Sequence, residues 1–236
     1  MVRAGAVLLQ AWLPTASQSH AFGPKRRPGG AEARTPGEPA FAKIVALVPV
    51  RDEAHLLPST LRALSHIVDA AVVLDDCSTD GSGEVARSLA EECKVERVAR
   101  TPSCPDPGAA EGGALPSWGD EFAQRNFLLQ LGRQVGGTHF LMLDADEVLV
   151  VGHGAPDETL QLRLDFRSLQ PGDVLVVHYV TMYKTSRSYR SDKNDMKAIG
   201  FADQEGAVFR RNSGNDRLHA SRIPYIPKPG TAFELL

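Results

Sequence analysis

Three acidic residues stand together directly after a short apolar run near the middle of the chain. The run is Phe140 to Leu143, and Asp144, Asp146 and Glu147 follow it. A continuous apolar run of this length is typical of a strand buried on both faces, and in open α/β sheets ligands bind beyond the carboxyl ends of such strands. Two carboxylates separated by one small residue suit a hard divalent ion that also contacts a diphosphate. A solvated acidic turn is the competing interpretation.

Two earlier strands are also predicted to end in charged residues. The first is a β-branched run at 44–50 that contains Pro49 near its end, and the second is an apolar run at 70–74. The charged residues that follow these runs are Arg51, Asp52, Glu53, Asp75 and Asp76. The turn formers after Asp76 can cap the next helix, so a purely structural role for that loop is an open alternative.

Helices are expected between these strands. Apolar residues recur at helical spacing over 56–68, 85–93 and 121–134, and a further strand is expected at 95–99. Two βαβ units in succession imply a parallel sheet with right-handed crossovers. The fold class is therefore α/β, and the strand ends that carry the acids should meet at one edge of the sheet.

The second half of the chain carries weaker patterns. Residues 101–120 are rich in Pro, Gly and Ala and exceed the usual length of a connection, so we expect a loop insertion there. Leu160, Leu164 and Leu169 mark a helix. Beyond it we expect a strand at 174–179, a charged mobile excursion at 182–196 and a short β-like segment at 206–210.

The first 42 residues differ in composition from the rest. Arg3 precedes an apolar run at 4–13 and small polar residues follow, which is the order of a secretory signal. Residues 22–39 are rich in Pro, Gly, Arg and Ala, as in a disordered linker or a transit peptide. We expect a signal or transit peptide with a linker at 1–42 and one domain at 43–236, delivered to the secretory pathway or a plastid. The alternative is a disordered N-terminal tail that carries no targeting signal, and hence a cytoplasmic protein.

Charge and cysteine content disfavour several classes of protein. The net charge is −3, and because residues 1–43 carry six basic and two acidic side chains, the remainder carries −7. This charge disfavours a nucleic-acid partner. Cys77, Cys93 and Cys104 form no CxxC pair, so we expect free thiols rather than a disulfide framework or a zinc site. No apolar run reaches the roughly 18 residues of a membrane-spanning helix, so no transmembrane span is expected.

Four motifs then occur in order along residues 43–150. They are VALVPVRDE (45–53), VVLDDCSTDG (72–81), FAQRN (122–126) and FLMLDADE (140–147). Together they resemble family 2 glycosyltransferases of the GT-A fold, and most closely the short members similar to lipopolysaccharide-core glucosyltransferases. The resemblance implies a Rossmann-like α/β/α sandwich whose central sheet is mostly parallel, with a small mixed extension in the C-terminal half.

The resemblance also implies roles for individual residues. Arg125 would reach the diphosphate of the donor, and Asp144 and Asp146 would hold Mn²⁺ or Mg²⁺. His219 stands where family members often supply a further metal ligand, although a lone histidine is more often structural. The nucleotide-sugar pocket would be lined by Pro49, Arg51, Glu53, Asp75, Asp76, Arg125 and Asp144.

The general base is the part of the family pattern that this sequence lacks. An inverting displacement needs a carboxylate that accepts the proton of the acceptor hydroxyl. Relatives commonly carry His-Glu where this chain has His219-Ala220. The remaining base candidates are Asp203, Glu205 and Asp216, with the segment 203–205 preferred because it precedes a strand expected on the acceptor side.

Three functions compete on this sequence. The favoured one is a metal-dependent inverting glycosyltransferase, with a UDP-linked sugar as donor and a saccharide, lipid or protein hydroxyl as acceptor. The missing His-Glu pair motivates a catalytically silent nucleotide-sugar-binding module. A nucleotidyltransferase is less favoured, because that class usually has a glycine-rich phosphate loop where this chain has residues 49–53.

Overall fold

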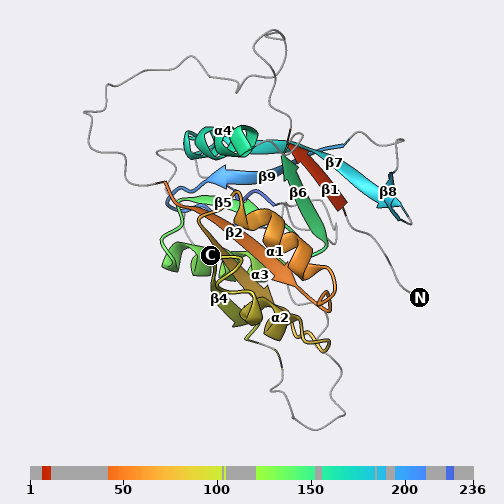
Figure 1. Ribbon diagram of the computed structural model, residues 1–236. Helices are drawn as coiled ribbons and strands as arrows, with labels where there is room; N and C mark the ends of the chain where they lie inside the picture. Colours follow the sequence, from red (N-terminus) through yellow and green to blue (C-terminus); the bar gives the residue numbers. More distant parts are fainter. Residues whose placement is uncertain are drawn as a thin grey trace, which may run out of the picture.

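The computed structural model describes residues 7–11, 42–102, 104, 121–151, 156–183, 185–189, 195–210 and 222–225. These residues form a mixed α/β fold built on nine strands and four helices (Figure 1). The strands are β1 (Val7–Ala11), β2 (Ile44–Val50), β3 (Ala70–Asp75), β4 (Val95–Arg100), β5 (His139–Met142), β6 (Glu147–Val151), β7 (Val174–Tyr183), β8 (Thr185–Tyr189) and β9 (Asp195–Ala202). The helices are α1 (Leu57–Ser65), α2 (Ser82–Ser88), α3 (Glu121–Gln134) and α4 (Pro156–Arg167). Within the described ranges no helix is both long and apolar enough to cross a membrane.

All nine strands belong to one sheet. Its order is β4-β3-β2-β5-β9-β7-β1-β6, and β8 pairs with β7 outside this path. The four strands from β4 to β5 are parallel to one another, as the two βαβ units predicted. Residues of β2 alternate between two cores: Ile44 lies in the core under α1 and α2, and Val45 in the core under α3. The α/β class, the parallel centre and the mixed extension are therefore confirmed.

The mixed half of the sheet contains two segments that the sequence did not predict as strands. The interval 182–196, expected to be a mobile excursion, contains β8 and the start of β9, and β9 pairs antiparallel with both β5 and β7. Within 1–42, expected to be leader and linker, Val7–Ala11 forms β1 between β7 and β6. The expectation for 182–196 was wrong, because the strand partners are remote in sequence and local composition does not encode them. Cleavage of the N-terminal segment stays a prediction.

Helix α4 forms where it was expected but buries a different face. Leu160 and Leu164 are 56% and 49% exposed, whereas Leu162 and Phe166 are buried. The ring of Phe166 lies against Gly200 of β9, where a Cβ would approach its Cε2 and Cζ to 2.9 Å. Packing on β9, which the sequence did not predict, therefore decides which side of α4 faces the core.

Helix α3 lies unusually close to the sheet at Gly132. A Cβ at this position would stand 2.7 Å from Cε1 of Phe140 and 2.7 Å from Cδ2 of Leu47. Nearer the start of the same helix, Asn126 binds the backbone of Phe209: its Nδ2 donates to the Phe209 carbonyl at 2.7 Å, and its Oδ1 accepts from the Phe209 N–H at 2.8 Å. The helix is thus fixed both to the sheet and to the segment that follows β9.

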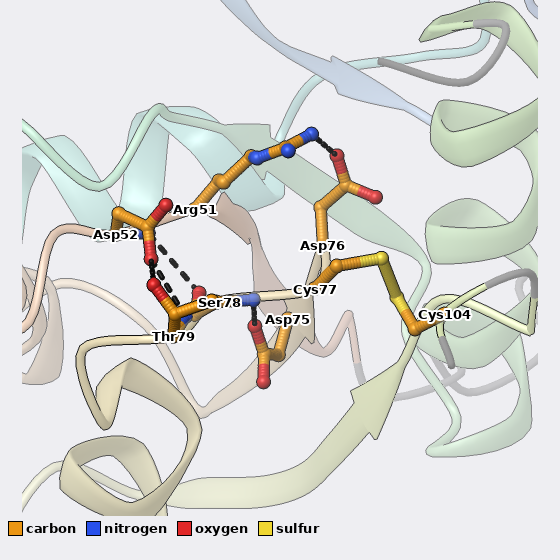
Figure 2. The surroundings of a disulfide bond; sticks show 8 residues. All are labelled: Arg51, Asp52, Asp75, Asp76, Cys77, Ser78, Thr79 and Cys104. Carbon is orange, nitrogen blue, oxygen red and sulfur yellow. Dashed lines mark hydrogen bonds and ion pairs between the residues drawn. A yellow bond between two sulfur atoms is a disulfide. The ribbon is translucent and has the colours of Figure 1, made fainter. Parts of the chain in front are cut away.

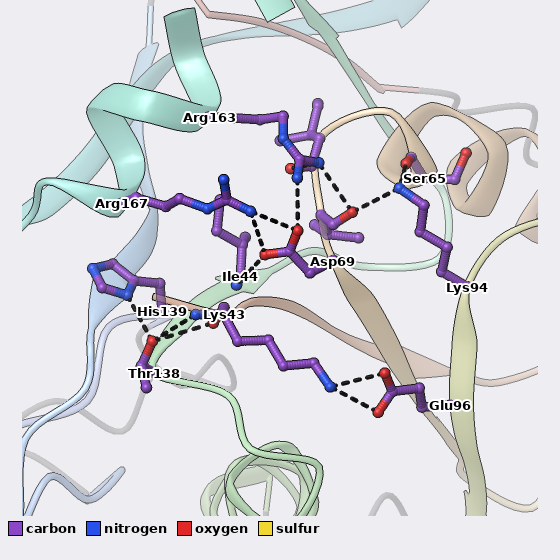
Figure 3. A network of polar contacts seen from close by, with 12 residues as sticks. Lys43, Ile44, Ser65, Asp69, Lys94, Glu96, Thr138, His139, Arg163 and Arg167 are labelled. Carbon is purple, nitrogen blue, oxygen red and sulfur yellow. Dashed lines mark hydrogen bonds and ion pairs between the residues drawn. The ribbon is translucent and has the colours of Figure 1, made fainter. Parts of the chain in front are cut away.

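Ion pairs hold the elements together at the amino edge of the parallel strands (Figure 3). Asp69 accepts a hydrogen bond from the Ile44 N–H at 2.9 Å and pairs with Arg163 and Arg167 of α4 at 2.6 and 2.7 Å. Arg163 also donates to the carbonyls of residues 67 and 68, which end the α1 connection. Close by, Lys94 donates to the Ser65 and Val68 carbonyls. This network ties α4 to β2 and to the start of β3.

Candidate functional site

Three loops meet at the carboxyl edge of the parallel strands, opposite the ion pairs around Asp69. They follow β2, β3 and β5, and β2 lies between the other two strands. Pro49 lies two residues beyond Leu47, the last residue of β2 that pairs with β5, and therefore stands at this edge. The acids at the ends of β3 and β5 therefore share one edge, as the parallel arrangement predicted.

The loops after β2 and β3 are bonded to each other (Figure 2). Asp52 donates its N–H to the Ser78 hydroxyl at 3.1 Å, and its Oδ1 accepts from the Thr79 N–H at 2.7 Å. Asp80 accepts from the Ala54 N–H at 2.8 Å through Oδ2. Each contact joins a side chain of one loop to the backbone of the other, so the two loops form a single polar unit.

Ser82 at the start of α2 completes that unit. Its hydroxyl accepts from the Glu53 N–H at 3.0 Å and donates to Oδ1 of Asp80 at 2.6 Å. The side chain of Glu53 is thereby placed by a backbone bond to the neighbouring loop. The turn formers after β3 thus fix the loop that carries Glu53, whereas the N-cap residue of α2, Gly81, makes no side-chain cap hydrogen bond.

Asp75 and Asp76 lie side by side but have different environments. Oδ1 of Asp75 accepts from the Ser78 N–H at 2.8 Å, and its Oδ2 faces the first turn of α2, where a Cβ on Gly83 would lie 2.8 Å away. Asp75 is thus engaged in building the loop. Asp76 instead forms an ion pair with Arg51 at 3.6 Å. Of the two residues expected in the nucleotide pocket, Asp76 has the carboxylate that points away from the loop backbone (Figure 2).

The cysteines depart from the expectation of free thiols. Cys77 and Cys104 form a disulfide with a Cα to Cα distance of 5.3 Å, and Cys93 is the free, buried cysteine. Their sulfur atoms and a carboxylate oxygen of Asp76 lie within 4.8 Å of one another. Because the two sulfur atoms are bonded to each other, they are not available as thiolate ligands. The prediction was wrong because a separation of 27 residues carries no sign of the pairing.

The acidic turn after β5 is held against α1. The Thr60 hydroxyl donates to the carbonyl of Ala145 at 2.7 Å. Burial raises the pKa of Asp146, and the neighbouring charges of Asp144 and Glu53 raise it further. The negative charge of Asp146 is therefore unfavourable beside those of Asp144 and Glu53, and a bound cation would relieve this repulsion.

The carboxylate of Glu53 would also be stabilised by a bound cation. Burial raises its pKa, and its Oε2 is buried without a hydrogen-bond partner in the described part of the chain. Nδ1 of His55 lies 3.9 Å from this oxygen, which is beyond hydrogen-bond range. A hard divalent ion prefers carboxylate oxygens of this kind, so the residues present fit such an ion.

Arg222 is the member of this cluster that sequence reasoning missed. Its guanidinium contacts both oxygens of Glu147 and Oδ2 of Asp144. Glu147 is fully buried and also accepts from the Asp144 N–H at 3.2 Å. No sequence signal identified Arg222, because 75 residues separate it from Glu147.

Arg125 lies in α3 near the same edge of the sheet. It is buried, and its Nη2 pairs with Oε1 of Glu121 one turn earlier, at 2.5 Å. The structure therefore gives Arg125 a partner within its own helix. A contact with a diphosphate stays a prediction.

The preferred base candidates lie at the opposite edge. Asp203 donates its N–H to the Thr138 carbonyl, just before β5, and pairs with Arg133 through both carboxylate oxygens at 2.7 and 2.8 Å. Asp144 lies six positions after Thr138 along mostly extended chain, which is roughly 20 Å at about 3.3 Å per residue. Glu205 lies two residues beyond Asp203 and is exposed. Neither is positioned as a base for this site, because β9 runs antiparallel to β5 and ends at the amino edge.

The two other predicted residues lie outside the described ranges. They are Asp216, a base candidate, and His219, a metal-ligand candidate. Both stay predictions.

Comparison with known proteins finds partial similarity to solved structures. The chain matches no protein-family model and no curated protein. Among solved structures it is similar to TarS residues 1–349 from S. aureus, also determined in complex with UDP, with 22% identity and a TM-score of 0.33 over 44% of this chain and 27% of that chain. It is also similar to the mannosyltransferase PcManGT from Pyrobaculum calidifontis in complex with GDP-Man and Mn²⁺, with 21% identity and a TM-score of 0.34 over 56% of this chain and 35% of that chain. The chain thus spans about a third or less of the length of these proteins.

Proposed function

We propose that the chain is a metal-dependent glycosyltransferase that moves a sugar from a nucleoside diphosphate sugar to a hydroxyl acceptor. The observation that carries the proposal is that Asp144 and Glu53 lie close enough to Asp146 for their charges to act on it, at the edge where the loops after β2 and β3 form one polar unit. The four motifs that resemble family 2 glycosyltransferases support it. The same resemblance favours a UDP-linked hexose as the donor and transfer of the lipopolysaccharide-core type.

The carboxylates of Asp144 and Asp146 would hold Mn²⁺ or Mg²⁺. Such an ion, when bound, supplies a Lewis acid that neutralises the charge on the departing diphosphate. Asp76 would accept a hydrogen bond from the base of the nucleotide, and the ion pair with Arg51 orients its carboxylate. The bonded loops keep these side chains in place before the donor arrives, so little ordering is needed on binding.

For the base, Asp216 remains of the three candidates, since Asp203 and Glu205 lie at the other edge. It would accept the proton of the acceptor hydroxyl, whether the acceptor is a saccharide, a lipid or a protein. Attack from the face opposite the departing diphosphate would invert the anomeric centre. His219 is proposed as a further metal ligand.

A second candidate is a catalytically silent module that binds nucleotide sugars. It is favoured by the pairing of Asp203 with Arg133, which removes the preferred base, and by the alanine that follows His219. Binding without transfer distinguishes it from the enzyme.

The proposal is tested by measuring UDP binding and UDP release from UDP-glucose, with and without Mn²⁺. Wild-type protein should bind and release UDP in a metal-dependent manner, and Asp146→Asn should weaken the metal-dependent binding by about a hundredfold or more. Asp157→Asn, an exposed acid on α4, is the matched control and should leave both unchanged. Binding with no release would favour the silent module. Wild-type protein that binds neither UDP nor GDP, the latter measured in the same binding assay, and releases no UDP would refute both.

We also propose that the protein works in an oxidising compartment, as a secretory address would provide. The disulfide between Cys77 and Cys104 supports this, because cytosolic reductants keep most thiols reduced. Mass spectrometry of alkylated protein, taken from its native cells without reduction, should find these two cysteines protected and Cys93 alone modified after unfolding. Alkylation of all three would contradict the proposed location.

A further inference from the structure

Arg222 contacts two carboxylates that have very different exposure. Its Nη1 and Nη2 bind the two oxygens of Glu147 at 2.5 and 2.6 Å, and Nη2 also binds Oδ2 of Asp144 at 2.6 Å. The side chain of Glu147 is 2% exposed and that of Asp144 is 40% exposed. The guanidinium thus reaches from a buried carboxylate to one that faces solvent.

The contact with Glu147 has a structural explanation. A buried carboxylate needs a cation and filled hydrogen bonds, and the fork of an arginine provides both. The additional contact with Asp144 has no such explanation, because that carboxylate is half exposed and water could solvate it. Its Oδ2 is nevertheless occupied by the guanidinium, next to Asp146, whose pKa is raised by burial and by the charge of Asp144.

A divalent ion that used Oδ2 of Asp144 would meet this guanidinium. Two cations on one oxygen repel each other, so the binding of each weakens the binding of the other. A diphosphate offers arginine the same planar, two-point contact that a carboxylate does, and with more negative charge. A rotamer change at Arg222 could exchange Asp144 for a phosphate while the contact with the buried Glu147 is retained through Nη1.

From this geometry, and resting on the proposed function, we propose that Arg222 competes with the divalent ion for Asp144 until a nucleoside diphosphate withdraws its guanidinium. Arg222 is then a positioning residue that couples the two ligands. The metal binds weakly alone and tightly with the nucleotide, and by reciprocity the nucleotide binds tightly only with the metal.

The test measures Mn²⁺ affinity from the electron paramagnetic resonance signal of free Mn²⁺, with and without UDP, in wild type and in Arg222→Gln. In wild type, UDP should raise the affinity for Mn²⁺ by about tenfold or more. In Arg222→Gln, Mn²⁺ alone should bind about fivefold tighter than in wild type, and UDP should add less than about threefold. Arg97→Gln, a surface arginine of β4 bonded to Gln134, is the matched control and should behave as wild type.

Two outcomes would overturn the inference while leaving the proposed function intact. One is equal Mn²⁺ affinity of wild type and Arg222→Gln in the absence of UDP, and the other is undiminished coupling in the variant. If loss of the cation beside Glu147 prevents folding of Arg222→Gln, then Arg222→Lys decides: it keeps the charge but loses the fork, so its coupling must fall below that of wild type. Wild-type protein that binds neither Mn²⁺ nor UDP would instead refute the proposed function, and the inference with it.

Discussion

Breaking the disulfide by Cys104→Ser should lower the free energy of unfolding by about 3.5 kcal/mol. The bond closes a chain segment whose ends are 27 residues apart. In the chain-entropy treatment, a closed loop of this length restricts the unfolded chain by about 12 cal/mol/K, which gives about 3.5 kcal/mol at 25 °C. Cys104 is the better position to change, because Cys77 is buried and its backbone has a φ of +59°, so a substitution there would add other effects.

The effect is measured by urea unfolding under non-reducing conditions. With a urea dependence of about 2 kcal/mol per molar, the midpoint of Cys104→Ser should lie about 1.7 M below that of wild type. A reducing agent should lower the wild-type midpoint by a similar amount and leave the variant unchanged. Cys93→Ala serves as the control, since Cys93 is not bonded and its variant should keep its sensitivity to reduction.

The variant also tests the connection to the site. Cys77 directly follows Asp76, and Cys104 lies just after β4, so the bond joins the loop after β3 to the loop after β4. We expect weaker UDP binding by Cys104→Ser under conditions where both proteins are fully folded. The disulfide does not stabilise the fold if Cys104→Ser unfolds at the same urea concentration as oxidised wild type, or if reduction leaves the wild-type midpoint unchanged.

Three further substitutions test the packing of α3 on the sheet, the ion pairs at the amino edge and the position of Asp203 at that edge. Gly132→Ala should destabilise by about 1 kcal/mol in urea unfolding, since the gain in helix propensity is outweighed by a Cβ placed 2.7 Å from the ring of Phe140; greater stability would show that the ring moves freely. Asp69→Asn should cost about 2 kcal/mol at neutral pH, because Asp69 accepts charged hydrogen bonds from both α4 arginines. Burial acts to raise the pKa of Asp69, but the Ile44 N–H and these two arginines lower it below its usual value. The stabilisation by Asp69 is therefore complete above the pKa of the unfolded state and is lost as the pH falls through the pKa of the folded state. A stability difference between variant and wild type that persists in acid would contradict this. Asp203→Asn should destabilise by about 1 to 2 kcal/mol through its loss of charge opposite Arg133 while sugar transfer is retained, and a variant that is stable but inactive would restore Asp203 as the base.

The parallel half of the fold could be predicted because its signals are local. β2, β3 and β5 are short apolar runs, and runs of this kind need no knowledge of their partners to be identified. β9 was missed because it begins with charged residues and is defined by pairing with β5 and β7. The buried face of α4 could not be predicted for the same reason, since Phe166 packs on Gly200 of β9.

In the candidate site, too, only the residues that directly follow a parallel strand could be predicted. Asp144 and Asp146 could be placed at the carboxyl edge because they follow a parallel strand directly in sequence. Asp203 was preferred as the base because a strand was expected after it, but it follows β9, a strand that the sequence did not predict and that ends at the amino edge. Arg222 could not be found, since its relation to Glu147 exists only in three dimensions. Residues brought in from distant segments are thus the part of the site that sequence patterns do not reveal.

The ion pairs around Asp69 and the acids around Asp146 occupy opposite ends of the same strands. About four residues of buried β2 and β5 lie between them, so neither group contacts the other. Selection on thermal tolerance and selection on ligand preference can therefore act on separate sets of positions. A directed-evolution experiment could raise the stability of the protein through substitutions around Asp69, Arg163 and Arg167 without altering its ligand specificity. The loops at the carboxyl edge could then be varied in this more stable background.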